Sequence, residues 1–365
     1  VCPFADHLLR NGAGHYMDAW NYHIYADPSA YVKRHEGYRA LLDQHGLNLP
    51  CWVTEAGDRV QGPGGVLTRE SRIHQAAFVS RAFPQALAAG IERHFWFIFP
   101  FYKEGEIGWG LLEPDQRVPF PGLAAMATAT YALGRGEYLG ALPLPDEDAR
   151  ALAFARGDGT ASITLWREAD APAEVALPLA WKDVREARTH VGTPVPAGEG
   201  AVRLSAARAA IYLVLPEKAL PSGLTRPPML VQAKPVPGPA LAEVVTRIRV
   251  EGGRVDKDAG GYAVTPAAVT ILAAEVYNFG DKPVRVEPVL TASGGWPLAM
   301  DRAALSVAPG DRAVVPVQVT APDTYGAADF RLVARDGARE STPAIVRLHV
   351  DANAAKPREA RHLDL

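Results

Sequence analysis

Glu55 is a lone carboxylate at the polar end of an apolar run, and two side chains upstream could act with it. The run is PCWVTE (50–55), and the earlier stretch MDAWNYHIY (17–25) ends in His23 and Tyr25. A carboxylate can attack an anomeric carbon, and a neighbouring tyrosine hydroxyl can hold it ionised and aimed. These residue types favour chemistry on a sugar. The alternatives are an ordinary strand-end carboxylate and a histidine that belongs to the core.

Two tryptophans follow further along the chain. Trp96 lies in RHFWFIF (93–99) and Trp109 in IGWGLL. Because an aromatic face stacks well on the apolar side of a pyranose, we expect Trp96 to line a sugar subsite. For Trp109, substrate binding and loop packing are equally compatible with the sequence. The charged residues of the neighbouring loops are expected to be solvated rather than to bind substrate: Asp58, Arg59, Glu104 and Glu106.

The elements that must position these residues alternate along the first part of the chain. Apolar and aromatic runs predict strands at 17–25, 50–55 and 93–99. Helical spacing and capping signals predict helices at 29–45, 68–90 and 121–134. This order is typical of parallel βα units, whose strands deliver their C-terminal side chains to one rim. The polar strand ends should therefore converge.

The order of these motifs resembles the last three units of a (β/α)8 glycoside hydrolase of the large retaining clan, and is most similar to family 39. The resemblance covers about residues 1–138 and rests on HIY, WVTEAG, FWF and GWGLLEPDQRVPFPGLAAMATATYALG. It implies that Glu55, in a TE-x-G context, is the nucleophile. It also implies that His23 and Tyr25 support Glu55 and that Trp96 lines the sugar subsite. No cofactor and no metal is implied.

One carboxylate is missing from the pattern. Retaining hydrolysis needs two carboxyl groups about 5–5.5 Å apart. In the clan the acid/base follows an asparagine, yet the chain contains no Asn-Glu dipeptide. Since an eight-unit barrel takes about 250 residues, the barrel-like part has about half the usual length. We therefore expect the acid/base on a further polypeptide segment or chain that completes the barrel. A start on Val rather than Met agrees with a processed or partial product.

The composition changes near residue 140 from helix-and-strand patterns to short strands separated by Pro and Gly. The predicted fold class is α/β plus all-β, with the C-terminal half of a TIM barrel followed by a β-sandwich and an immunoglobulin-like β-sandwich. The predicted segments are a half-barrel at 1–140, an accessory sandwich at 141–218, a linker at 219–228, the immunoglobulin-like sandwich at 229–351 and a tail at 352–365.

Two local features of the third segment are also informative. The phrase NFGDKP (278–283) between two strand-like runs predicts a hairpin-type turn. Trp296 could mark a carbohydrate-binding face, although a place in the sandwich core is preferred.

The bulk properties exclude several classes of partner. A net charge of -3 with interspersed acids and bases gives no footprint for nucleic acid or an anionic membrane. No apolar run reaches the roughly 18 residues of a membrane span. Two cysteines provide neither a disulfide framework nor a metal site.

The favoured interpretation is a secreted or periplasmic retaining glycosidase that acts on a poly- or oligosaccharide. A non-catalytic carbohydrate-binding or scaffolding protein is the alternative. In a third interpretation, the accessory domains carry the main function by binding a polysaccharide or another protein.

Overall fold

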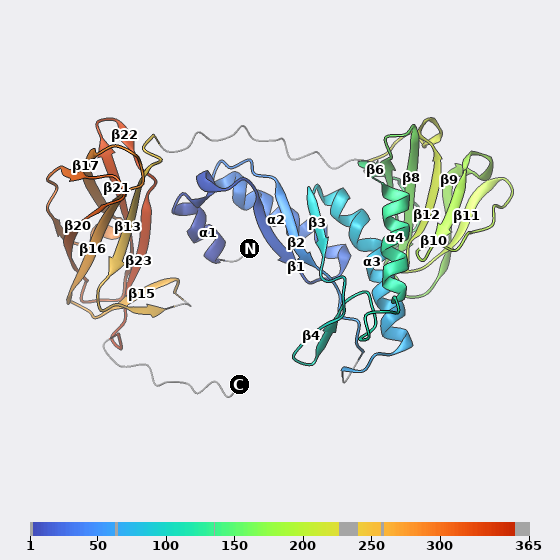
Figure 1. Ribbon diagram of the computed structural model, residues 1–365, viewed down its shortest axis with the longest axis horizontal. Helices are drawn as coiled ribbons and strands as arrows, with labels where there is room; N and C mark the ends of the chain where they lie inside the picture. Colours follow the sequence, from blue (N-terminus) through green and yellow to red (C-terminus); the bar gives the residue numbers. More distant parts are fainter. Residues whose placement is uncertain (1–2, 63–64, 135, 226–239, 257–258, 355–365) are drawn as a thin grey trace. The chain divides into compact units, whose positions relative to one another are not determined.

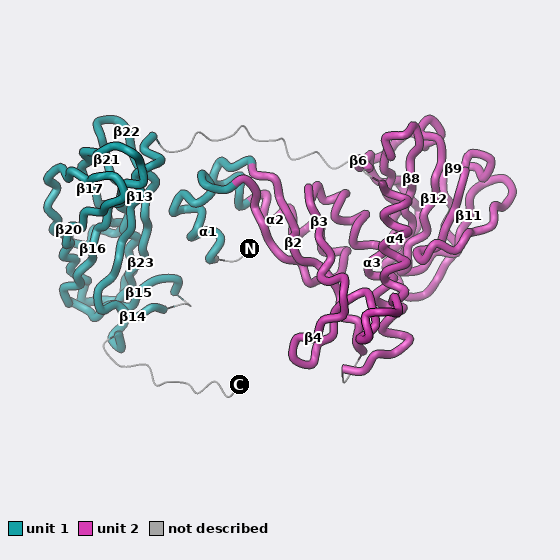
Figure 2. Tube along the Cα trace, in the orientation of Figure 1, with its two compact units in different colours: residues 1–17, 41–48, 233–365 teal, residues 18–40, 49–232 magenta. Residues whose placement is uncertain are grey.

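The computed structural model is a mixed α/β structure with much sheet and few helices (Figure 1). It describes residues 3–62, 65–134, 136–225, 240–256 and 259–354. The chain divides into two compact units (Figure 2). Unit 1 comprises 1–17, 41–48 and 233–365, and unit 2 comprises 18–40 and 49–232.

Unit 2 begins with a parallel sheet whose strands follow the chain order β1, β2, β3. These strands are β1 (Trp20–Ile24), β2 (Cys51–Ala56) and β3 (Arg93–Trp96). The alternating helices are α2 (Tyr31–Gln44), α3 (Arg69–Ala89) and α4 (Pro121–Leu133). The predicted strands, helices and parallel order are confirmed. Thr68 and Ser71 cap each other's backbone N–H groups at the start of α3, and Gly90 ends the helix in a left-handed conformation.

The two faces of this sheet differ in polarity. In β1, Trp20, Tyr22 and Ile24 are buried, whereas Asn21 and His23 are exposed. The same alternation places the exposed Phe95 of β3 on the open face, since its neighbours on either side are less exposed. One face of the sheet is therefore covered, and the other presents polar and aromatic side chains.

Unit 2 contains one buried histidine, His35, and one half-buried histidine, His94. The Nδ1 atom of His35 lies 2.8 Å from the Tyr22 hydroxyl, and His94 packs against the rings of Tyr31 and Phe83. Burial lowers the pKa of both histidines from 6.5 to about 4. Below pH 6.5 the unfolded chain therefore binds protons that the folded chain does not.

We accordingly expect the free energy of unfolding to decrease as the pH falls from about 6.5 to about 4. Urea denaturation at several pH values measures this slope. His94→Leu should flatten it, because the substitution removes one of the titrating groups, whereas the exposed His15→Gln should not. An unchanged slope in His94→Leu would contradict the assignment.

The sandwich of unit 2 is formed by β6 to β12. A five-stranded sheet has the order β10-β12-β8-β7-β6, and β11 pairs with β9. The bounds are β6 (Glu137–Ala141), β7 (Ala149–Ala155), β8 (Thr160–Arg167), β9 (Ala173–Ala180), β10 (Glu186–Thr189), β11 (Ala201–Ala206) and β12 (Ile211–Pro216). Side chains of both sheets, including Ile163, Leu177 and Val202, share one core.

A second core joins this sandwich to the helices. Leu133 of α4 clusters with Phe154, Trp166 and Tyr212 of the five-stranded sheet. The Tyr212 hydroxyl also donates a 2.7 Å hydrogen bond to the carbonyl of Ser80 in α3. The sandwich and the helices thus form one packed unit.

The expected linker at 219–228 begins within packed residues. Leu220 and Leu224 contact the sandwich core, and Thr225 pairs with Ala141. Residues 226–228 lie outside the described residues, as does the tail from 355 onward.

The third segment consists of two sheets. One has the order β13-β16-β20-β18, and the other has the order β14-β15-β23-β21-β17-β19, with β22 beside β21. The bounds are β13 (Val244–Val250), β14 (Arg254–Asp256), β15 (Gly261–Val264), β16 (Val269–Asn278), β17 (Val284–Ala292), β18 (Leu298–Met300), β19 (Leu305–Val307), β20 (Arg312–Thr320), β21 (Ala327–Asp336), β22 (Arg339–Glu340) and β23 (Ala344–Val350). Trp296 packs against Phe330 in their core, as preferred from the sequence.

The NFGDKP phrase does not form a hairpin. It links β16 to β17, and these strands belong to different sheets. The Asn278 side chain donates to the carbonyls of Lys282 and Val307, so it fixes a connection that crosses between the sheets. A turn sequence alone does not determine which sheet the next strand joins.

Helix α1 (Pro3–Arg10), in unit 1, was not predicted from the sequence. In the same unit, the hydroxyl of Tyr16 lies 2.8 Å from that of Thr342. Among the helices that the structure describes, none has the length and apolarity needed to cross a membrane.

Candidate active site

Glu55 lies at the C-terminal end of β2 and contacts His23 of β1 and Tyr25, which follows that strand. Its Oε2 atom accepts a 2.6 Å hydrogen bond from the Tyr25 hydroxyl and lies 3.3 Å from Nδ1 of His23. The Glu55 side chain is 35% exposed, so solvent or a ligand can reach it. The structure therefore brings together the carboxylate, phenol and imidazole that the sequence indicated.

A β-bulge aims Glu55 at these partners. In the pairing of β1 with β2, Tyr22 lies opposite Val53, but His23 lies opposite Glu55, so the register skips Thr54. A bulge of this kind re-aims the side chain that follows it. Glu55 consequently shares a row with His23, on the exposed side of β1.

The environment of the Tyr25 hydroxyl keeps it protonated. Partial burial, the hydrogen bond to Glu55 and the negative charges of Glu55 and Glu104 all raise the pKa of Tyr25 well above its usual value of 10. The phenol therefore remains a hydrogen-bond donor over the physiological pH range. A permanent donor is suited to hold a carboxylate in one orientation.

An aromatic wall stands beside the carboxylate. The Tyr25 ring lies 5.1 Å from the Trp109 ring and 6.2 Å from the Phe97 ring. Phe97 in turn contacts Trp109 and Tyr102. Trp109 and Tyr102 come from a hairpin formed by β4 (Tyr102–Glu104) and β5 (Ile107–Trp109). Trp109 thus joins the site, whereas Phe97 was missed in the sequence.

Gly57 allows the wall to approach β2. A Cβ atom at this position would lie 2.3 Å from the carbonyl oxygen of Phe97, closer than such atoms come in proteins. The glycine of the TEAG stretch therefore lets the end of β3 pack directly against the residues that follow Glu55.

Trp96 lies away from Glu55, and the expectation that it lines the sugar subsite there is corrected. It shares a row with Ala56 and, through Ala56, with the buried Ile24. That row belongs to the covered side of the sheet, where Trp96 packs edge-on against Phe78 of α3. Side chains alternate along a strand, so Trp96 and the next residue point to opposite faces. The same alternation in FWF would have identified Phe97.

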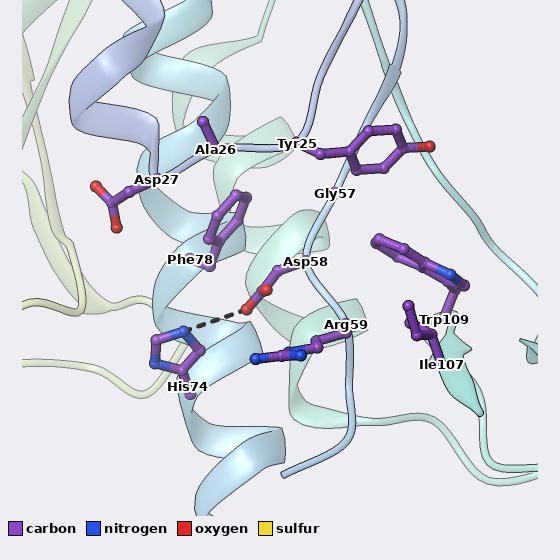
Figure 3. Close-up of a pocket in the computed structure, with 10 residues that line it drawn as sticks. All are labelled: Tyr25, Ala26, Asp27, Gly57, Asp58, Arg59, His74, Phe78, Ile107 and Trp109. Atoms are coloured by element: carbon purple, nitrogen blue, oxygen red, sulfur yellow. Dashed lines mark ion pairs between the residues drawn. The ribbon is translucent and has the colours of Figure 1, made fainter. Parts of the chain in front are cut away.

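A pocket of about 370 Å³ opens next to this wall (Figure 3). Tyr25 and Trp109 line it together with Phe78 and Ile107, and its polar lining includes Asp58, Arg59 and His74. His74 Nε2 lies 3.2 Å from a carboxylate oxygen of Asp58. The hydrogen bond with Asp58 raises the pKa of His74 and favours an ion pair. The sequence had indicated only solvated loop charge here.

The loop after β1 is anchored by buried charge. Arg81 of α3 is 1% exposed and donates two hydrogen bonds, of 3.0 and 3.1 Å, to the carboxylate of Asp27. It also bonds Glu168, and Arg208 forms a further ion pair with Asp27. Burial alone would raise the pKa of Asp27, but the bonds from Arg81 and Ser29 hold it well below its usual value. Asp27 stays charged, two residues from Tyr25.

The described residues contain no group of three or more His, Cys, Asp or Glu side chains that could hold a metal ion. The site offers one accessible carboxylate, its two polar neighbours and an aromatic wall.

If Glu55 is the nucleophile that the resemblance implies, Tyr25→Phe should weaken catalysis without unfolding the protein. The change removes the hydroxyl that orients Glu55 but keeps the ring in contact with Trp109. Because hydrogen bonds to charged groups contribute about 1.5–3 kcal/mol, we expect kcat to fall roughly ten- to hundredfold. Hydrolysis of an aryl glycoside, with Tyr102→Phe as the control, measures the effect. Equal activity of Tyr25→Phe and the wild type would mean that the hydrogen bond has no catalytic role.

Comparison with known proteins finds no matching family model and no match among curated proteins. Solved structures with partial similarity include glycoside hydrolases. A family 39 enzyme from Bacteroides cellulosilyticus WH2 is 20% identical, with a TM-score of 0.47, 57% of this chain covered and 46% of that one. A family 30 endoxylanase from Clostridium papyrosolvens C71 is 14% identical, with a TM-score of 0.38 and coverages of 56% and 50%. An endo-β1,6-glucanase is 11% identical, with a TM-score of 0.37 and coverages of 57% and 43%. The chain thus spans about half the length of the glycoside hydrolases that it resembles.

Proposed function

We propose that the chain carries the nucleophile side of a retaining glycoside hydrolase site that acts on a poly- or oligosaccharide. The observation that carries the proposal is the contact of Glu55 with Tyr25 and His23 at the end of a parallel strand. Carboxyl ends of parallel strands are where catalytic groups gather in βα proteins. In this proposal Glu55 attacks the anomeric carbon and forms a covalent glycosyl-enzyme intermediate.

The hydrogen-bond pattern of Glu55 suits a nucleophile. Both contacts, from Tyr25 and from His23, are made to Oε2. Within the described part of the chain, Oε1 accepts no hydrogen bond. One oxygen is therefore held in place, and the other is left without a hydrogen bond and can approach a sugar carbon.

The aromatic wall supports a sugar as substrate. Tyr25 and Trp109 present ring surface beside the carboxylate, and 44% of Tyr25 is exposed. Pyranose rings stack their C–H faces on such surfaces while their hydroxyls bond to polar groups. His23, which is half-exposed at the same rim, provides a polar group of this kind.

The acid/base is proposed to come from a polypeptide that completes the barrel. In the described residues, β1 and β3 are the edges of a three-stranded sheet. The open face exposes Phe95 and Arg93 of β3 together with Asn21 and His23 of β1. Native proteins cover such edges and apolar side chains. A further segment or chain placed there would bring a second carboxylate opposite Glu55.

A mechanism-based label tests the nucleophile. A 2-deoxy-2-fluoro glycoside with an activated leaving group should accumulate a covalent adduct. The fluorine slows both formation and breakdown of the intermediate, and the good leaving group keeps its formation faster than its breakdown. Mass spectrometry of the digested protein should place the sugar on Glu55. An adduct on another carboxylate would remove Glu55 from this role.

Glu104 provides a matched control for the second carboxylate. It lies in β4, and its negative charge contributes to the raised pKa of Tyr25. If the acid/base comes from a completing polypeptide, Glu104→Gln should keep nearly full activity. A loss as large as that of Glu55→Gln, reversed by added azide, would assign the acid/base to Glu104 instead. If the protein binds sugar but shows no turnover, a non-catalytic carbohydrate-binding protein is the better description.

A further inference from the structure

The pocket next to Tyr25 contains one arginine that forms no ion pair within the described part of the chain. Asp27 is neutralised by Arg81 and Arg208, with oxygen–nitrogen distances of 3.0 and 3.3 Å. Asp58 is paired with His74 at 3.2 Å. Glu106, in the adjacent hairpin, pairs with Lys103.

Arg59 remains. In the described residues it has no ion pair, and it lines the pocket from the loop after β2 (Figure 3). The undescribed positions in the same loop are Pro63 and Gly64, which carry no charge. An exposed guanidinium at the mouth of a concave site is a good partner for a carboxylate or sulfate, which it can bind through two parallel hydrogen bonds.

The remaining walls fit a sugar. Phe78, Trp109 and Ile107 supply apolar surface, and the Asp58–His74 pair supplies a donor and an acceptor. A volume of about 370 Å³ lies within the range of roughly 300–1,000 Å³ found for small-molecule sites. Tyr25 connects the pocket to Glu55, because its ring lines the pocket while its hydroxyl bonds the carboxylate.

We propose that this pocket is a subsite for a sugar unit carrying a single negative charge, and that Arg59 determines this specificity. The inference rests on the proposed glycosidase function, because it takes the pocket to be continuous with the site at Glu55. Arg59 binds the acidic group, Trp109 and Phe78 contact the ring, and the Asp58–His74 pair bonds the hydroxyls. The acidic group is a carboxylate, as in a uronic acid, or a sulfate ester.

Binding of simple sugars to the 365-residue chain tests the proposal. D-glucuronate, D-glucose 6-sulfate and neutral D-glucose are titrated while tryptophan fluorescence and ligand NMR signals are followed. At least one anionic sugar should bind about tenfold or more tightly than glucose. A preference for glucuronate assigns the carboxylate, and a preference for the 6-sulfate assigns the sulfate. Equal affinity for all three, or no binding of either anion, overturns the proposal.

Variants separate a specific contact from a general electrostatic effect. Arg59→Gln should reduce binding of the anionic sugar to the level of glucose and leave glucose binding unchanged. Lys103→Gln removes the same charge from the neighbouring hairpin and should have little effect. Equal losses in the two variants would overturn the assignment to Arg59.

The two proposals fail separately. Glu55→Gln should bind the anionic sugar as the wild type does, since it leaves the pocket intact. Selective binding without any hydrolysis would reject the enzymatic function and keep the subsite. Hydrolysis with no dependence on Arg59 would keep the function and reject the subsite.

Discussion

Under the proposed function, Glu55→Gln is expected to reduce kcat by several orders of magnitude in an enzyme completed by the second carboxylate. The amide is nearly the same size as the carboxylate and can still accept the hydrogen bond from Tyr25. It is a very poor nucleophile, so the covalent step is lost while ground-state contacts remain. Single-turnover kinetics with an activated aryl glycoside should therefore show a large fall in rate and a nearly unchanged binding constant.

Two further measurements make this result specific. The thermal unfolding midpoint should stay within a few degrees of the wild type, because Glu55 is accessible and not part of a core. Added azide should restore turnover in Glu55→Ala with inverted anomeric configuration, because a small anion can occupy the space of the carboxylate. Wild-type activity in Glu55→Gln would return Glu55 to the status of a strand-end residue.

Arg81→Met is expected to give the largest loss of stability among single changes near the site. The guanidinium is 1% exposed and serves two carboxylates, Asp27 and Glu168. Removing it leaves both without their main partner, and breaking buried pairs in this way costs about 3–5 kcal/mol. The lower end, about 3 kcal/mol, is expected, because the carboxylates themselves remain 34% and 19% exposed to water. Urea denaturation measures the change.

An exposed pair provides the comparison. Arg203 bonds Glu174 at 3.0 Å, but both side chains are more than half exposed. Arg203→Met should change the free energy of unfolding by less than about 1 kcal/mol. The double variant Arg81→Met/Asp27→Asn should recover part of the loss, because it removes one of the uncompensated charges. A loss in Arg81→Met no larger than that in Arg203→Met would contradict this account of the buried network.

The spacing of apolar residues predicted the strands and helices that hold the site. The polar residues at the strand ends predicted which side chains meet there. The alternation of strand and helix was sufficient to place Glu55 beside His23 and Tyr25, because parallel strands in chain order align their C-terminal ends. Trp96 packs against Phe78 on the covered face, because the position of a residue within the strand, and not its type, decides which face its side chain occupies. The pocket could not be predicted, since it joins Asp58, His74 and Ile107 from three elements whose distances depend on packing.

The two remaining errors have a shared cause. The NFGDKP turn has hairpin residues, but strand partners in a sandwich are chosen by the two sheets and not by the turn between them. Helix α1 is amphipathic but covers only eight residues, which is too short a stretch for its spacing alone to distinguish a helix. Both features depend on contacts with residues far away in the sequence, which local patterns do not contain.

The core that joins the helices to the five-stranded sheet limits how this architecture can change during evolution. Trp166 and Tyr212 are each at most 1% exposed, and they pack with Leu133 of α4 on the side of the sheet away from the main sandwich core. If recombination removed the sandwich, the remaining protein would expose an apolar surface on α4. Arg81 would also lose its partner Glu168, and Asp27 would lose Arg208. The sandwich should be inherited together with the βα segment rather than exchanged between genes as an independent module.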